Sequence, residues 1–249
     1  MVYQSDAFKI YQRRLTLDTL LFVFDRNYQE LRGFITDAVK PDHIDLLWKQ
    51  REATVILREV IRLVHNYVAS AKMLVDNTRP LIQDWYKNTS FLAEYNAEVR
   101  SRFLNNTLSL FIEDLRNYIL HYSLPITTAS VKVTVDQTTG NQTEIAAITI
   151  NKPALLRWKK WSKGKKFLDT AEDEIVVFDI IEQYYHQVTD FHEWMHKAFD
   201  TFHAAEFAWL KEMELRINDL RTKQTSAIRI TLPERPQEHP DTDSTPDAG

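Results

Sequence analysis

The stretch from Asp169 to Lys223 contains neither proline nor glycine, and this absence constrains the fold more than any other feature of the chain. Hydrophobic residues recur along it at a spacing of about 3.5 residues, which is typical of a helix with one apolar face. These residues are Ile181, Tyr184, Val188, Phe191, Met195, Phe202, Trp209, Met213, Ile217 and Leu220. An unbroken helix of this length would span about 80 Å, which exceeds a compact domain of this size. We therefore expect the helix to bend or to protrude toward a partner.

The first 125 residues also show helical periodicity, with apolar residues at three- and four-residue steps. The pattern predicts helices over about 6–38, 42–76 and 97–122, with a less regular aromatic segment over 81–96. The sequence "DNTRP" is expected to close the second of these helices. Pro125 should end the last one within a turn of His121, because a residue that precedes proline disfavours the helical conformation. The chain has only 4 glycines in 249 residues, which fits long helices and few turns.

The character of the sequence changes after Pro125. Alternating β-branched and polar residues on both sides of Gly140-Asn141 predict a β-hairpin over about 130–150. We therefore expect a mainly α fold: an up-and-down helical bundle with a small β-hairpin insert and a long C-terminal helix. The expected regions are 1–125 (the helical bundle), 126–168 (hairpin and basic connector), 169–225 (the long helix, packing on the bundle or on a partner) and 232–249 (a disordered acidic tail).

Composition excludes several classes of protein. The chain has no cysteine, so disulfides and thiolate metal sites are ruled out. The N-terminus lacks the apolar core of a signal peptide, and no apolar run is long enough to span a membrane. We expect a cytoplasmic protein without a membrane partner. The net charge of −4 resides in the tail from Pro233 onward, because the rest of the chain carries equal numbers of acids and bases. An acidic partner would therefore need a local basic patch.

The candidate site is the pair Arg116 and His121 in "DLRNYILHYSLP". A histidine can move protons near neutral pH, and the planar guanidinium of arginine matches a phosphate. Together they can support RNA cleavage without a metal or another cofactor, because one group moves protons while the other stabilises charge on the phosphate oxygens. Five residues on an ideal helix separate the two side chains by about 140°. The helix must loosen near Pro125, or a second copy must complete the site. The alternative is that both residues are polar groups on the rim of a bundle.

The sequence "RNYILH" resembles the R-x4-6-H signature of the HEPN superfamily (higher eukaryotes and prokaryotes nucleotide-binding domains). Its position at the end of a fourth amphipathic helix is also similar to that family. The resemblance implies a HEPN-like bundle and a metal-independent endoribonuclease of a bacterial defence or toxin–antitoxin system, acting on RNA as a homodimer, with an antitoxin or regulatory protein as a further partner. It implies that Arg116 binds phosphate, His121 is the acid and base, and Asn117 orients the arginine. Some members of the family are silent binding modules, and this is the alternative function.

The connector "RWKKWSKGKKF" combines six bases with aromatic residues and has no acid. Bases that neutralise phosphates and rings that stack on unpaired nucleobases together predict a contact with single-stranded RNA. The candidate residues are Arg157, Trp158, Lys159, Lys160, Trp161, Lys163, Lys165 and Lys166. The alternatives are a solvated connector whose tryptophans lie in the core, an anionic partner protein, or the acidic tail of the chain itself.

Two other groups of histidines are candidates. His65 and Asn66 lie within a predicted helix, where a buried core histidine is the simpler interpretation. If the helices pack as a bundle, they are expected to lie behind Arg116 and His121 and to support them. The sequence "HEWMH" over 192–196 matches the H-E-x-x-H zinc-protease pattern. On a continuous helix the acid Glu212 lies about 24 Å from His196, too far for a third zinc ligand. No metal site is therefore expected.

Overall fold

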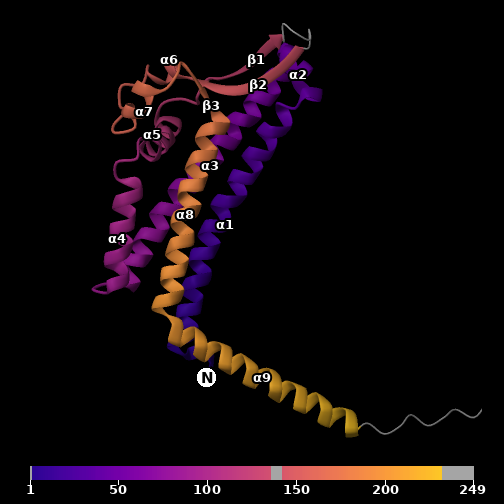
Figure 1. The fold of residues 1–249 in the computed structure, drawn as a ribbon, viewed down its shortest axis with the longest axis vertical. Helices are drawn as coiled ribbons and strands as arrows, with labels where there is room; N and C mark the ends of the chain where they lie inside the picture. Colours follow the sequence, from indigo (N-terminus) through magenta and orange to yellow (C-terminus); the bar gives the residue numbers. More distant parts are fainter. Residues whose placement is uncertain (1, 136–141, 232–249) are drawn as a thin grey trace, which may run out of the picture. The chain divides into compact units, whose positions relative to one another are not determined.

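A computed structural model of the chain describes residues 2–135 and 142–231, and within them the fold is mainly helical with one small antiparallel sheet (Figure 1). This confirms the predicted fold class. Short 3-10 helices at Val2–Gln4 and Pro41–His43 accompany the regular elements. In chain order these are α1 (Asp6–Ala38), α2 (Ile44–Trp48), α3 (Gln50–Trp85), α4 (Ser90–Phe103), α5 (Thr107–His121), β1 (Thr127–Val135), β2 (Gln142–Asn151), α6 (Lys152–Leu155), α7 (Lys165–Thr170), β3 (Glu174–Val176), α8 (Val177–Phe202) and α9 (Ala204–Thr231).

The chain divides into two units. One unit is Ile10–Ala204, which joins the predicted helical bundle, the hairpin, the basic connector and the first half of the predicted long helix. The other consists of Met1–Lys9 and Ala205–Gly249. The candidate site residues all fall within the first unit. In the described part of the chain, none of the helices combines the length and the apolar character that crossing a membrane requires.

Three long helices, α1, α3 and α8, form the body of the larger unit (Figure 1). Their aromatic residues meet in its core. Tyr28 on α1 stacks on Tyr185 of α8 with ring centroids 3.5 Å apart. The Tyr28 hydroxyl donates to Glu182 at 2.7 Å, and burial together with this carboxylate raises the pKa of Tyr28. Tyr67 of α3 is buried and donates to the carbonyl of Ile181 at 3.0 Å. These polar anchors fix the register of the three helices along one another.

The second predicted helix differs from the observed one at both ends. Lys49 has extended backbone angles (φ −88°, ψ 112°), so α2 and α3 are separate helices. The sequence "DNTRP" does not close the helix, because α3 continues through Pro80 to Trp85. Proline lacks an N–H, so one helical hydrogen bond is missing there. Buried Ile82, one turn short of the end, holds the last residues of α3 in the core despite this loss.

The predicted helix over 97–122 is also wrong in its bounds, because the chain breaks it in two. α4 ends at Phe103, and α5 begins at Thr107. The side chain of Asn106 accepts a hydrogen bond from the backbone N–H of Ser109 at 2.9 Å and so caps the N-terminus of α5. The less regular segment over 81–96 comprises the end of α3, a short turn and the first half of α4.

The predicted β-hairpin is confirmed, and its turn at Gly140-Asn141 lies outside the described residues. β1 and β2 pair antiparallel with Thr127 opposite Ile150. A third strand, β3, was not predicted; it pairs with β2 through Thr149 and Val176 in the order β1-β2-β3. It has three residues, so it carries too short an alternation to be recognised in the sequence.

The long helix predicted over 169–225 is wrong in its bounds, because Glu174–Val176 form β3 and α8 begins only at Val177. The helix is also interrupted within its length. α8 ends at Phe202, His203 leaves the helical conformation (φ −110°, ψ 24°), and α9 begins at Ala204. His203 is buried, and its Nε2 lies 2.9 Å from the hydroxyl of Tyr86, the residue that follows α3. The rings of Phe199 and Phe202 also contact His203. The interruption thus depends on packing against a distant segment and not on a proline or glycine. The tail over 232–249, predicted to be disordered, lies outside the described residues.

Candidate functional site at the end of α5

Helix α5 places Arg116 and His121 on one regular helix. The predicted end within a turn of His121 is confirmed, because α5 ends at His121 itself. The N–H of Tyr122 still donates to the carbonyl of Tyr118 at 2.9 Å, so the helical bonding persists to the last residue. The loosening that would turn both side chains to one face is therefore not observed between them. The separation of about 140° remains, and one chain alone does not bring the two groups together.

The arginine and the histidine differ in their surroundings. Arg116 is half-buried and donates from Nη1 to Oδ1 of its neighbour Asn117 at 3.2 Å. His121 is exposed at the end of the helix. Among the residues that the structure describes, no hydrogen bond or ion pair involves the His121 imidazole. Its ring is accessible to an external group, whereas the guanidinium of Arg116 is already oriented from within the chain.

His65 and Asn66 on α3 are half-buried and contact each other, with Nδ1 of His65 at 3.4 Å from Oδ1 of Asn66. Within residues 2–135 and 142–231, no hydrogen bond or ion pair connects them to Arg116, Asn117 or His121. The structure does not join these two groups by a direct polar contact.

The basic connector is fixed to α5 by a buried carboxylate. Asp114 is 5% exposed, and its carboxylate accepts from the backbone N–H of Ser162 at 2.8 Å, from the Ser162 hydroxyl at 2.9 Å and from the N–H of Gly164 at 3.0 Å. Hydrogen bonds to a charged acceptor are stronger than neutral ones. The clamp holds the connector on the helix that carries Arg116 and His121. Sequence reasoning missed Asp114, because its partners lie 48 and 50 residues away and no local pattern marks them.

Gly164 allows this close approach. A Cβ at this position would lie 2.7 Å from the carbonyl oxygen of Leu110 and 2.8 Å from Oδ2 of Asp114. Both distances are shorter than van der Waals contact, and one of the two neighbours is backbone that cannot rotate away. The connector therefore needs a residue without a side chain where it crosses α5.

The aromatic residues of the connector pack inward. Trp158 is buried, Phe167 lies with its ring centroid 4.5 Å from that of Phe111, and Trp161 stacks on Phe111 at 5.7 Å. The Trp161 Nε1–H donates to the carbonyl of Leu155 at 2.8 Å. The expectation that Trp158 and Trp161 stack on nucleobases does not fit these contacts, because their rings are engaged in the core. The alternative of tryptophans tucked into the core describes them.

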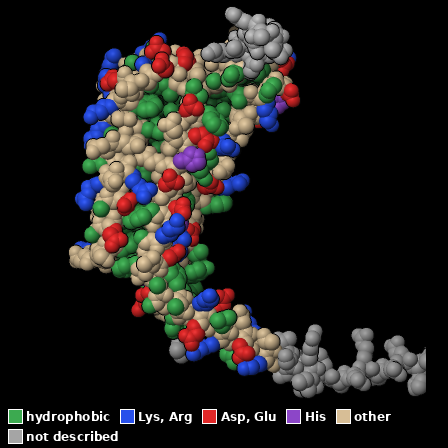
Figure 2. All heavy atoms as spheres, viewed as in Figure 1, with side chains coloured by type: hydrophobic (Ala, Val, Ile, Leu, Met, Phe, Trp, Pro, Cys, Tyr) green, Lys and Arg blue, Asp and Glu red, His purple; other side chains and the backbone are tan. Residues whose placement is uncertain are grey.

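The cations of the connector, in contrast, point to solvent. All six are exposed, and blue side chains gather along the edge of the molecule that α6 and α7 form (Figure 2). They are Arg157, Lys159, Lys160, Lys163, Lys165 and Lys166, and we call them the basic strip. Lys165 forms an ion pair with Asp169 at 2.6 Å. A strip of this kind can neutralise phosphates of either a nucleic acid or another anionic partner.

Exposed apolar residues flank His121 in the chain. Large hydrophobic side chains alternate with other residues from Leu120 to Ile126 and remain about half exposed. They are Leu120 (46%), Tyr122 (51%), Leu124 (54%) and Ile126 (50%), and we call them the apolar rim. Exposed apolar residues that cluster together mark surfaces that another molecule covers.

The H-E-x-x-H residues lie on α8 and do not converge. His192 is 3% exposed, and burial lowers its pKa to about 3. Glu193 lies on the solvent side, where it pairs with Lys197. Nε2 of His196 lies 3.4 Å from Oδ1 of Asp18 on α1. In the described residues, no group of three or more histidine, aspartate or glutamate side chains is placed to hold a metal ion.

Comparisons with known proteins do not narrow the assignment. No family model, no curated protein and no solved structure matches the chain.

Proposed function

We propose that this protein is a metal-independent endoribonuclease with a HEPN-like site that two copies of the chain complete. The observation that carries the proposal is the exposed His121 at the end of α5, on the same helix to which Asp114 fixes the basic strip. Arg116 would bind the scissile phosphate, His121 would transfer protons, and Asn117 would keep the guanidinium oriented through the contact at 3.2 Å.

The reaction would proceed by attack of the 2'-hydroxyl of RNA on the adjacent phosphorus. His121 would accept the hydroxyl proton or protonate the 5'-oxygen as it leaves, and Arg116 would stabilise the charge on the phosphate oxygens. The products would be a 2',3'-cyclic phosphate and a 5'-hydroxyl. The basic strip would hold the RNA through its phosphates and supply no base recognition, because the aromatic rings of the connector pack against α5.

A second copy of the chain could bring an arginine and a histidine to the same phosphate. Arg116 and His121 of one helix project about 140° apart, so they cannot contact one phosphate from the same chain. The apolar rim lies directly beside His121 and is the kind of surface that a two-fold partner covers. In such a dimer, Arg116 of one copy meets His121 of the other. By this resemblance, the enzyme would act in a bacterial defence or toxin–antitoxin system, with an antitoxin or regulatory protein as a further partner.

The experiment is cleavage of mixed-sequence RNA by the purified protein in excess EDTA. Arg116→Ala and His121→Ala should each abolish cleavage, whereas His186→Ala, a matched change at an exposed histidine of α8, should not. Mixing the two inactive variants should restore roughly a quarter of the wild-type rate, because half of the dimers regain one intact site. Absence of cleavage by the wild-type protein, or equal cleavage by all variants, would reject the enzyme.

The second candidate function is a catalytically silent helical module that binds nucleic acid or a protein. One observation favours it: α5 is regular through His121, so the motif of a single chain is not assembled. In that case the basic strip would still bind RNA, and neither the wild-type protein nor any variant above would cleave it.

A further inference from the structure

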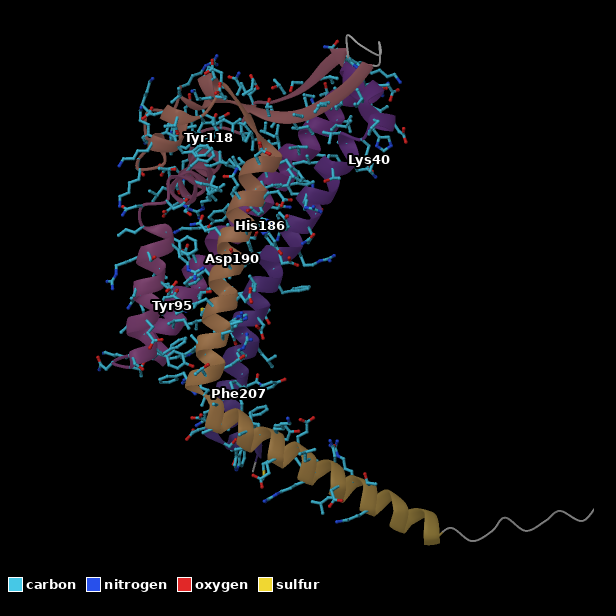
Figure 3. All side chains as sticks on the ribbon, viewed as in Figure 1. Lys40, Tyr95, Tyr118, His186, Asp190 and Phe207 are labelled. Atoms are coloured by element: carbon cyan, nitrogen blue, oxygen red, sulfur yellow. The ribbon has the colours of Figure 1, made fainter. Side chains whose placement is uncertain are left out.

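A cavity of about 370 Å³ lies between α3, α4, α5 and α8, within the larger unit. Small-molecule sites are commonly clefts of about 300–1,000 Å³ with mainly apolar walls, so this cavity is large enough for a ligand. Its deep wall is hydrophobic and includes Val68, Leu74, Tyr95, Val188 and Phe191. Tyr95 comes from the side of α4 that faces α8 (Figure 3), where its ring centroid lies 5.7 Å from that of Phe191.

Two buried polar side chains line the same cavity. Thr78 on α3 is 2% exposed, and His192 on α8 is 3% exposed. Among the described residues, neither the Thr78 hydroxyl nor Nδ1 of His192 has a hydrogen-bond partner. A buried polar group without a partner destabilises a fold by about 1–3 kcal/mol, so nearly all such groups bond to protein, to ordered water or to a ligand. A ligand with a polar atom in the cavity would satisfy them.

The mouth of the cavity is positively charged. Lining residues that are exposed mark where it opens, and they include Arg79 on α3, Arg100 on α4 and Lys163 of the basic strip. No ion pair of these three cations is found within residues 2–135 and 142–231. Among the described residues that line the cavity, one is acidic: Glu113, which lies 3.7 Å from Lys72. Lys72 also pairs with Asp76 at 2.8 Å. The mouth thus retains an excess of positive charge.

The rim of the mouth also carries exposed apolar side chains, since Val75 is 36% and Leu104 is 50% exposed. An opening with apolar edges and unpaired cations favours a molecule that has a hydrocarbon part and an anionic end.

We propose that this cavity binds a single-chain amphiphile with a carboxylate or phosphate head group. The hydrocarbon chain lies among the apolar side chains of α3, α4 and α8, and the head group contacts Arg79, Arg100 and Lys163. The proposal does not depend on nuclease activity. If both hold, Lys163 belongs to both sites, so an occupied cavity reduces the charge that the basic strip offers to RNA.

The test measures binding of four twelve-carbon probes to the full-length protein below their micellar concentrations. Dodecanoate and dodecyl phosphate should bind saturably with one molecule per chain, and the cationic dodecyltrimethylammonium should bind at least about tenfold more weakly. Neutral dodecanol measures the contribution of the hydrocarbon chain alone. With methyl-labelled protein, dodecanoate should shift the NMR signals of Ile112 and Val188, which line the cavity, and leave Ile150 of β2 unchanged.

Two variants identify the site. The exposed double change Arg79→Glu and Arg100→Glu should weaken binding of both anionic probes about tenfold and leave dodecanol unaffected, whereas Arg51→Glu with Lys87→Glu should change neither. Val99→Trp fills the cavity and should remove binding of all probes; if this variant fails to fold, the charge variants decide. Equal affinity for anionic and cationic probes, no saturation, or shifts at Ile150 equal to those at Ile112 would overturn the proposal.

Discussion

The carboxylate of Asp114 accepts a hydrogen bond from the backbone N–H of Ser162 at 2.8 Å, across 48 residues of sequence. The same carboxylate binds the Ser162 hydroxyl and the N–H of Gly164. These hydrogen bonds add to the packing of Trp158, Trp161 and Phe167, which holds the same segment against α5. The clamp therefore gives the basic strip a fixed position relative to Arg116 and His121.

Replacing Asp114 by asparagine should destabilise the fold. The amide has a similar shape but lacks the charge, and its NH2 group cannot accept the hydrogen bonds that one carboxylate oxygen now accepts. We expect the free energy of unfolding to fall by about 2–3 kcal/mol in urea denaturation. Ser162→Ala removes only the hydroxyl contact and should cost about 1 kcal/mol. Equal stability of Asp114→Asn and the wild type would show that the clamp is not a structural anchor.

Gly164 and Gly33 allow a matched pair of alanine substitutions with opposite expected effects on stability. Gly164→Ala should lower the free energy of unfolding by about 1–3 kcal/mol, because the new Cβ would meet the Leu110 carbonyl at 2.7 Å. Gly33→Ala on α1 meets no atom within 4 Å and should stabilise the helix by about 0.5–1 kcal/mol. Thermal unfolding of both variants checks the signs. A stabilised Gly164→Ala would contradict the close packing of the connector on α5.

The sequence predicted those elements whose signals are local. The bounds of α1 and the pairing of β1 with β2 follow from periodicity within a few turns of chain, and both agree with the structure. The interruption at His203 could not be predicted from local periodicity, because it depends on the contact with Tyr86 and on the packing of two phenylalanine rings. The continuation of α3 through Pro80 likewise follows from tertiary packing, which overrides local preference.

In the candidate site, too, the features that could be predicted are those with a local signal in the sequence. The arginine, the histidine and the connector cations were recognisable by residue type and spacing, and the exposure of His121 could be expected from its place at a helix end. The clamp by Asp114 and the inward packing of Trp161 could not, because each depends on which distant segment covers the residue. Residue type suggested that Trp161 stacks on a nucleobase, whereas in the fold its ring stacks on Phe111.

The buried His192 predicts a dependence of stability on acid. Burial lowers the pKa of His192 to about 3 from its usual 6.5. Below pH 6.5 the unfolded chain therefore binds a proton that the folded chain does not bind until about pH 3. Stability from this residue is full above pH 6.5 and falls with decreasing pH by up to about 1.4 kcal/mol per pH unit.

His192→Leu should remove this contribution. Between pH 6.5 and 5, the free energy of unfolding of the wild type should fall by about 2 kcal/mol more than that of the variant. Phe191→Leu, at the neighbouring position, should lower the free energy of unfolding at every pH without changing its dependence on pH. Parallel curves for His192→Leu and the wild type would show that the imidazole is not excluded from water.

The packing of Trp161 predicts that this ring contributes to stability and not to RNA binding. Trp161→Leu should reduce the free energy of unfolding by about 1–3 kcal/mol, since the stacking on Phe111 and the hydrogen bond to Leu155 are lost. The affinity for single-stranded RNA, measured at a temperature where the variant is folded, should remain within about twofold. A loss of about tenfold or more would mean that the ring stacks on a base.

The side chains of the basic strip should contribute to RNA binding and not to stability. Replacing Lys159, Lys160, Lys163 and Lys165 by alanine should leave the free energy of unfolding within about 0.5 kcal/mol of the wild type, because these side chains are exposed. Affinity for single-stranded RNA should fall, and the slope of log affinity against log salt should become shallower by up to about 3, because each lost phosphate contact on a single strand contributes about 0.7. The same four substitutions at Lys40, Lys49, Lys87 and Lys197, which are exposed elsewhere, control for net charge. If both quadruple variants lose affinity equally, binding follows overall charge, and the strip that Asp114 fixes on α5 is not the RNA surface.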